Sequence, residues 1–271
     1  MRVQMLGLCR FSYLGLRGFQ KDHQTIEERR AFLYHPARLE RRWFWFQHVM
    51  LPAWLAQSDP DFTLVAMTGP DLPQPWLDRL HDLAARMPQL RVSLVAPMDR
   101  HLPACMAAVA PHIDPRADAV GHFRHDDDDA VAVDFIARAR ADFGDAEGLW
   151  RRHGILCLDH MRGLMVRTDT RAVRIQPRMC YNMGVAQTIF LPPNLPRTAL
   201  HYEHWKVGLW MPGVSIGAPL MFLRLIHGDS DSGDAGPGFP WPVEEAEMPA
   251  ILQDRFRIDI ADLDEGARRF G

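Results

Sequence analysis

The stretch GHFRHDDDDAVAVDFIARARADF, residues 121–143, places four consecutive aspartates, Asp126 to Asp129, between a short apolar run and a segment with helical periodicity. Two unit charges about 4 Å apart repel by roughly 1 kcal/mol in bulk water and by about 4 kcal/mol near a protein surface. Adjacent carboxylates therefore need a cation, a helix end or open water beside them. The sequence on either side indicates which of these the fold supplies.

Strand and helix patterns alternate along the first half of the chain. Apolar strand patterns occupy residues 3–9, 61–68, 89–97 and 118–124, and helical patterns occupy 37–58, 74–87, 102–111 and 130–143. We expect Pro52 to kink or divide the helix over 37–58, whose apolar stripe is Leu39, Trp43, Phe46, Met50, Trp54 and Leu55. This alternation predicts an α/β fold with a mostly parallel sheet and helices on both faces.

Length and composition set the domain organisation. The chain has 271 residues, 47% hydrophobic and 24% charged, which is enough for one large core. Beyond Gly144 the alternation is less regular and prolines are more frequent. We therefore predict a single domain with a regular α/β half over residues 1–147 and an elaborated half with a C-terminal extension over 148–271. The two halves can still share one sheet.

Charge, cysteines and hydropathy narrow the class of protein. The net charge is −3 and the arginines are scattered, which argues against binding nucleic acid by neutralising phosphates. The four cysteines form no CxxC pair, so we interpret them as reduced core thiols. No run of about 18 uncharged apolar residues occurs. We predict a cytoplasmic protein, with peripheral membrane contact left open.

The aspartates themselves suggest two uses. Asp129 is expected to cap the helix that follows it, but capping uses only one or two carboxylates, worth about 1 kcal/mol each. In an open α/β sheet ligands collect at the carboxyl ends of strands, where Asp126 falls. Mg²⁺ and Mn²⁺ use one or two carboxylates together with water and substrate phosphates. The cluster therefore predicts a site for Mg²⁺ or Mn²⁺ and a diphosphate.

These residues also carry a resemblance. An apolar strand followed by Asp-x-Asp-Asp and then DFI resembles the metal-binding signature of GT-A nucleotide-sugar glycosyltransferases, with Asp126 and Asp128 as the DxD and with Asp134 and Phe135 after it. More narrowly, CRFSY at 9–13, FRHDDDDAVAVDF at 123–135 and LIHG at 225–228 are similar, in this order, to the bacterial rhamnosyltransferase family. The similarity spans most of the chain.

The resemblance implies a GT-A-like fold and a metal-dependent glycosyltransferase. Residues 1–147 would bind a nucleotide-sugar donor, rhamnose being the sugar in the family's name, and 148–271 would face a glycan or lipid-linked acceptor. Asp126, Asp128 and His227 would hold Mn²⁺ or Mg²⁺, which bridges the donor phosphates and stabilises the leaving nucleoside diphosphate. The alternative for His227 is a loop histidine bonded to the backbone.

The donor pocket is expected after the first strand, at Arg10, Phe11 and Ser12. Phe11 would stack on the base and Ser12 would hydrogen-bond it, although a core phenylalanine is the more common alternative. Asp71 would touch the nucleoside or cap the next helix, and we favour the cap.

Residues around the aspartates are expected to complete the donor site. Asp126 and Asp127 would contact the donor, and Arg124 would bind the diphosphate or, alternatively, pair with an aspartate. His122 and His125 flank the strand end, and alternation along the strand favours a solvent-facing His125.

The transfer needs a general base to deprotonate the acceptor hydroxyl. Glu203 is the first candidate because His201, His204 and Trp205 surround it, as expected for a sugar-binding wall. The alternative is a surface glutamate, and Asp159 is then the second candidate. Asn182 is expected in the acceptor cleft.

Two further expectations remain. The Gly- and Ser-rich loop over 228–240 is expected to order over bound donor and metal. Competing functions are a metal-dependent phosphohydrolase, whose ligands usually come from several separated motifs, and a non-catalytic sugar- or metal-binding protein.

Overall fold

A central sheet of seven strands organises the protein. In the computed structural model, which describes residues 1–16, 23–98, 100–169, 172–228, 230 and 238–271, its order is β10-β6-β9-β4-β1-β2-β3. The strands are β1 (Val3–Arg10), β2 (Thr63–Thr68), β3 (Leu90–Leu94), β4 (Ala119–His125), β6 (Leu156–His160), β9 (Gln187–Leu191) and β10 (Gly213–Ile216). All pairings are parallel except those of β9 with β4 and β6. Every strand but β9 therefore points its carboxyl end to the same edge.

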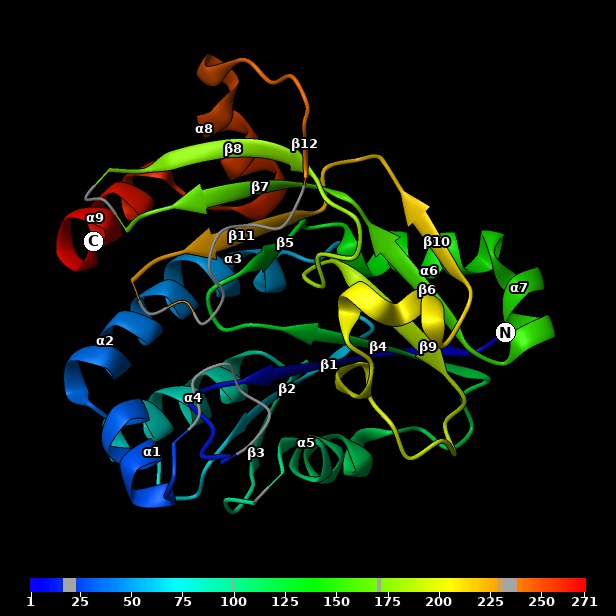
Figure 1. The fold of residues 1–271 in the computed structure, drawn as a ribbon, viewed down its shortest axis with the longest axis horizontal. Coiled ribbons are helices and arrows are strands. Elements are labelled where there is room, and N and C mark those ends of the chain that lie inside the picture. Colours follow the sequence, from blue (N-terminus) through cyan, green and yellow to red (C-terminus); the bar gives the residue numbers. More distant parts are fainter. Residues whose placement is uncertain (17–22, 99, 170–171, 229, 231–237) are drawn as a thin grey trace.

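A second, smaller sheet lies beside the first. Its order is β12-β8-β7-β11-β5, with β5 (Ala130–Val131), β7 (Arg162–Arg167), β8 (Arg174–Met179), β11 (Phe222–Ile226) and β12 (Phe239–Pro240). In Figure 1 this sheet lies at the end of the molecule that also holds α8 (Met248–Ile251) and α9 (Ile260–Phe270). The chain crosses from the central sheet to the second sheet through residues 126–129, between β4 and β5.

Helices cover both faces of the central sheet. Along β1, Leu6 and Leu8 pack with α5 (His101–Val109), whereas Met5 and Cys9 belong to the larger core on the opposite face. That opposite face is covered by α2 (Pro36–Trp45), α3 (Leu51–Leu55), α4 (Gln74–Arg86) and α6 (Phe135–Asp145). The remaining helices are α1 (Ile26–Leu33) and α7 (Glu147–His153). The predicted α/β fold, with mostly parallel strands and helices on both faces, is confirmed.

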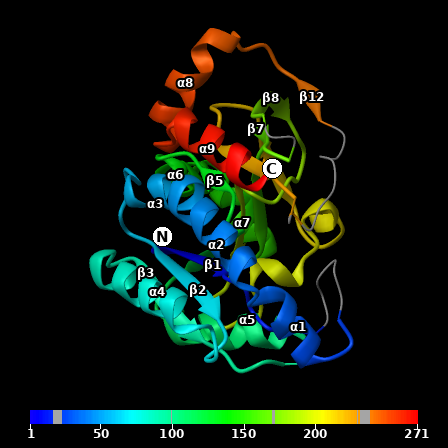
Figure 2. The ribbon, with the colours of Figure 1, turned by 90° about the vertical axis from the view of Figure 1, so that its left-hand side faces the viewer.

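The predicted helix over 37–58 is divided at the proline. The chain runs through α2, a π-helical segment Phe46–Met50 and α3, in which Pro52 is the second residue. Proline lacks an N–H and clashes with the carbonyl of the preceding turn, and a π-helical turn accommodates both. Most of the predicted stripe is buried, but Leu55 is 59% exposed, so its assignment to the stripe was wrong. Figure 2 shows α2 beside α9.

The predicted helix over 130–143 begins later than its pattern indicates. Residues 130–131 form β5, which pairs antiparallel with Phe222 and Leu223 of β11, and α6 starts only at Phe135. Its N-cap residue is Asp134, whose carboxylate pairs with Arg255 at 2.7 Å. The helical spacing of the apolar residues is therefore real from Phe135 onward, while Ala130 and Val131 pair across the second sheet.

The central sheet takes strands from both halves of the chain. β1 to β4 precede residue 147, and β6, β9 and β10 follow it. Among the described residues, no helix is both long enough and apolar enough to cross a membrane.

Candidate active site at the strand ends

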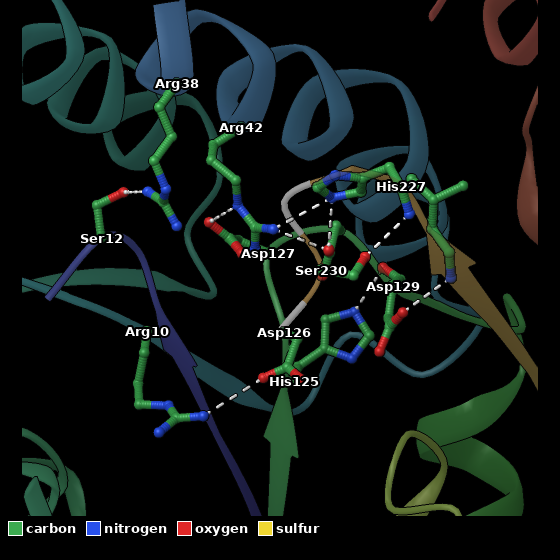
Figure 3. Close-up of polar contacts among 12 residues, drawn as sticks. Arg10, Ser12, Arg38, Arg42, His125, Asp126, Asp127, Asp129, His227 and Ser230 are labelled. Atoms are coloured by element: carbon green, nitrogen blue, oxygen red, sulfur yellow. Dashed lines mark hydrogen bonds and ion pairs between the residues drawn. The ribbon is translucent and has the colours of Figure 1, made fainter. Parts of the chain in front are cut away.

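The aspartate turn lies where the two sheets meet. β4 ends at His125, and β5 begins at Ala130 and pairs with β11, which ends at Ile226. His227 follows β11 and is thereby brought against the turn, although 99 residues separate it from Asp128. Its Nε2 lies 2.9 Å from Asp128 Oδ2. Figure 3 shows His227 near Arg42 of α2 and the aspartate turn.

A buried arginine from α2 occupies the centre of this turn. Arg42 Nη1 donates to Asp128 Oδ2 at 2.8 Å and lies 3.2 Å from His227 Nε2. Its Nε donates to Asp127 Oδ2 at 3.1 Å, and its Nη2 contacts Asp127 Oδ1. Burial alone would raise the pKa of Asp128, but Arg42 and the hydrogen bond from His227 outweigh it and hold that pKa well below its usual range. The guanidinium of Arg42 thus already supplies the positive charge that the aspartates of the turn need.

Asp126 faces the other way, toward two arginines at the strand ends. Cys9 and His125 are partners in the parallel β1–β4 register, so the next residues, Arg10 and Asp126, are neighbours. Arg10 Nη2 lies 3.6 Å from Asp126 Oδ1, and Arg124 Nη2 lies 3.9 Å from Oδ2. Burial raises the pKa of Asp126, and the two arginines more than offset this, so its pKa is lowered. With 38% of its side chain exposed, Asp126 is the accessible carboxylate of the turn.

Asp129 does not cap a helix, so that prediction was wrong. Because β5 follows it, its carboxylate instead accepts the backbone N–H of Leu225 at 3.0 Å and ties the turn to β11. Burial, with Asp128 and Asp126 nearby, raises its pKa well above the usual value. The raised pKa favours the neutral form of Asp129, which reduces the repulsion among the four adjacent carboxylates.

The predicted metal ligands come together only in part. Asp128 and His227 meet at hydrogen-bond distance, and Asp126 faces Arg10 and Arg124 instead. Across the described part of the chain, no group of three His, Cys, Asp or Glu side chains is placed to hold a metal ion. The Asp128–His227 pair still offers one carboxylate and one imidazole, a donor set that suits Mn²⁺ when water and phosphate complete the shell.

The residues predicted to bind the nucleotide base of the donor are mostly buried. Phe11 is fully buried and packs edge-on against Trp43 and Phe46, so it belongs to the core and the stacking role was wrong. Ser12 is also buried, in a left-handed conformation at φ 47°, and its Oγ accepts from Arg38 at 3.3 Å. Asp71 does not cap α4, whose N-cap is Pro73. Its carboxylate pairs with Arg30, on α1, at 2.5 Å.

The two histidines of β4 are both buried. Alternation does put Arg124 and His125 on opposite faces, but α3 covers the face of His125, whose ring lies 5.2 Å from that of Trp54. The expectation of a solvent-facing His125 was therefore wrong. Burial lowers the pKa of His125 and of His122 to about 4. Arg124 is 28% exposed and remains at the site.

A second acidic position lies at the end of β6. Asp159 is 3% exposed, and its Oδ2 accepts the backbone N–H of Asn182 at 2.6 Å. Asn182 has a left-handed backbone, φ 52°, and its carbonyl contacts His204 Nδ1. Burial raises the pKa of Asp159 to about 6, partly offset by the Asn182 N–H. β6 and β4 are parallel with β9 between them, which puts their ends about 10 Å apart on one edge.

Glu203 lies on the surface. Its side chain is 52% exposed and pairs with Lys206 at 2.8 Å, as the surface alternative anticipated. A solvated carboxylate paired with lysine is a poor general base, which argues against Glu203 in that role. Its neighbour His204 does reach the site, because Gly184, at φ 91°, brings the backbone between His204 and Arg124.

Two functional side chains were not among the predicted residues. Arg42 and Trp45 lie on α2, and Trp45 stacks on His227 with ring centres 5.9 Å apart. Trp45 is held from behind by α9, where a Cβ on Gly266 would lie 2.0 Å from its ring. The available signal was Arg38 and Arg42, one turn apart on a helix with a predicted buried stripe, since buried arginines need acidic or polar partners. The loop over 228–240, predicted to close over the donor, lies mostly outside the described residues.

Comparisons with known proteins identify the family. No curated protein matches the chain by sequence. A crystal structure of TarS from S. aureus in complex with UDP shares 11% identity and a TM-score of 0.42, covering 83% of this chain and 61% of its own. A crystal structure from Bacillus anthracis, described as a "Putative Glucose-1-Phosphate Thymidylyltransferase", shares 12% identity over 79% of this chain and 87% of its own, with a TM-score of 0.37. Both TM-scores are too low to support a functional conclusion.

The chain thus spans about three fifths of the TarS fragment, and the family match carries the identification. Residues 4–238 match the family described as "Putative rhamnosyl transferase", which includes β1, the aspartate turn and His227. The protein therefore belongs to this rhamnosyl transferase family.

Proposed function

We propose that the protein transfers a sugar, rhamnose, from a nucleoside diphosphate donor to a glycan or lipid-linked acceptor with the help of Mn²⁺ or Mg²⁺. The observation that carries the proposal is the meeting of Asp128 with His227 at 2.9 Å, directly beside the partly exposed Asp126 and two arginines. The proposal places the reaction in the cytoplasm, with a lipid-linked acceptor reached by peripheral contact with a membrane.

The donor diphosphate is assigned to the strand ends. Arg10 and Arg124 are 20% and 28% exposed and already face a carboxylate, so phosphate oxygens would find charge-assisted donors there. Asp128 and His227 would hold the ion, which supplies positive charge to the diphosphate as it leaves. Asp127 contributes indirectly, because it holds Arg42.

Asp159 is assigned as the general base. A base works best when its pKa lies near the working pH, and burial raises that of Asp159 to about 6. The N–H of Asn182 fixes one oxygen of the carboxylate, which leaves the other to accept a proton from an acceptor hydroxyl. The end of β6 lies about 10 Å from that of β4, a separation that leaves room for a sugar between donor and base.

The test is a turnover assay with the full chain. The protein is incubated with Mn²⁺ and a panel of dTDP-, UDP- and GDP-sugars, with and without bacterial glycan and lipid fractions, and free nucleoside diphosphate is measured. Acceptor-dependent release that a chelator abolishes and that Asp128→Asn loses supports the proposal. Release of nucleoside diphosphate that does not depend on the acceptor indicates a phosphohydrolase. No release from any donor indicates a binding protein.

A further inference from the structure

Arg42 sits where a divalent ion on the aspartate turn would have to bind. We propose that Arg42 is a resident cation that competes with the ion for Asp128 and His227, and so sets the affinity of the site for metal. This inference rests on the metal dependence in the proposed function. It assigns Arg42 as a positioning residue, because the proposal gives it no contact with the reacting atoms.

Distances within the turn support the competition. Nη1 lies 2.8 Å from Asp128 Oδ2 and 3.2 Å from His227 Nε2, and those two atoms lie 2.9 Å apart. An ion that held both atoms at roughly 2.1 Å would lie within about 4 Å of Nη1, whichever side of the pair it occupied. Two cations that close repel strongly in a site shielded from water. With Nη1 in place the ion is bound more weakly, and withdrawal of Nη1 relieves this repulsion.

The contacts of Arg42 show how it can withdraw without leaving the turn. Nε and Nη2 grip both oxygens of Asp127, a side-on fork separate from the Nη1 contact. The side chains of Arg42 and Asp127 are 10% and 4% exposed, so this ion pair is buried and well anchored. A rotation about that anchor would move Nη1 off Asp128. The neighbouring aspartates then have different roles: Asp127 retains the arginine, and Asp128 is shared between arginine and ion.

The experiment measures Mn²⁺ affinity, by electron paramagnetic resonance of free Mn²⁺, without nucleotide and at constant pH and ionic strength. Arg42→Gln removes the competing charge and is expected to tighten binding about tenfold or more. Arg42→Lys keeps the positive charge but loses the fork to Asp127, so it should tighten binding less than Arg42→Gln does. Asp127→Asn removes the anchor together with a negative charge beside the site, so it should not tighten binding as Arg42→Gln does. Arg38→Gln, one turn earlier on α2 and bonded to Ser12, is the matched control and should change little.

Unchanged or weaker Mn²⁺ binding in Arg42→Gln would overturn the inference, because Arg42 would then organise the ligands instead of opposing the ion. Circular dichroism verifies the fold of each variant. If Arg42→Gln does not fold, Arg42→Met, which keeps the length of the side chain without its charge, decides the question, and unchanged or weaker binding in that variant overturns the inference. Failure of the proposed function is separate: it would appear as wild-type turnover that a chelator leaves unaffected.

Discussion

Two buried acidic regions lie at the same edge of the central sheet, and the protein treats them in opposite ways. In the aspartate turn, Arg42 and its neighbours lower the pKa of Asp128 and keep it ionised. At the end of β6, Asp159 has a backbone N–H as its partner, and burial raises its pKa to about 6. The difference shows that the supply of arginine, more than burial, decides which carboxylates are charged. One region suits an ion and phosphates, and the other suits proton transfer.

The largest effect is expected where the proton is transferred. Asp159→Asn keeps the size of the side chain and the acceptor for the Asn182 N–H, but removes the base, so kcat should fall roughly 10²- to 10⁴-fold. Glu203→Gln is the control and should stay within about twofold, because Glu203 is half exposed and paired with Lys206. Initial rates of nucleoside diphosphate release measure both. The reverse ranking would restore Glu203 as the base.

On the other side of the comparison, Arg42→Ala should lower the free energy of unfolding by about 3–5 kcal/mol, since it leaves Asp127 and Asp128 buried without their cation. Arg38→Ala, which removes a contact to the neutral Ser12, should cost about 1 kcal/mol. Urea denaturation at pH 7 gives both values. Similar small losses would mean that water replaces Arg42 in the turn.

The pH dependence of stability sharpens the contrast. The pKa of Asp159 is about 6 in the folded protein and 3.8 as a free group, so folding favours the neutral form. The stability due to that neutral carboxyl is complete below about pH 4 and is lost as the pH rises through 6, by at most about 3 kcal/mol. Asp159→Asn should therefore be more stable than wild type at pH 8, by on the order of 1–3 kcal/mol, and equal to it at pH 4.

Urea denaturation at pH 4, 6 and 8 measures this difference, with Glu203→Gln as the control. The same ionisation should appear in catalysis: wild-type kcat/KM is expected to rise with pH up to about 6 and to level off above it. If wild type were more stable than Asp159→Asn at pH 8, the surroundings of Asp159 would not favour its neutral form.

The smallest effect is expected within the turn itself. Asp129→Asn keeps an acceptor for the Leu225 N–H and replaces a carboxyl whose pKa is already raised, so the unfolding free energy at pH 7 should change by less than about 1 kcal/mol. Asp127→Asn weakens a charged contact to Arg42 and should cost about 1–3 kcal/mol. Equal losses in the two variants would show that Asp129 is also held as an anion.

The sequence predicted those parts of the fold that depend on local pattern. The alternation of apolar residues identified β1, β2 and β4, and the end of β4 placed Asp126 at the correct edge of the sheet. The local pattern gave the wrong secondary structure where pairing with a segment distant in the chain determines it. Ala130 and Val131 continue a helical spacing but pair with residues 222–223 of β11.

The same limit applies to the site. Arg42 is 85 residues from Asp127, so the arginines of α2 indicated that a polar or acidic partner was needed but not which residue supplies it. The choice between Glu203 and Asp159 depends on burial, which only tertiary packing defines. Aromatic neighbours favoured Glu203 in the sequence, yet the structure leaves its side chain half exposed beside Lys206.

The contact between Trp45 and α9 limits how far the chain can be shortened. The family match ends at residue 238, before α9 begins at Ile260. Yet Gly266 of α9 closes against the indole that stacks on His227, and Phe270 packs on Phe44 and on Trp45 of α2. A truncated version cut to the recognisable family region would thus keep every candidate ligand while losing the buttress behind His227. The region that matches the family is therefore shorter than the region whose packing holds the site in place.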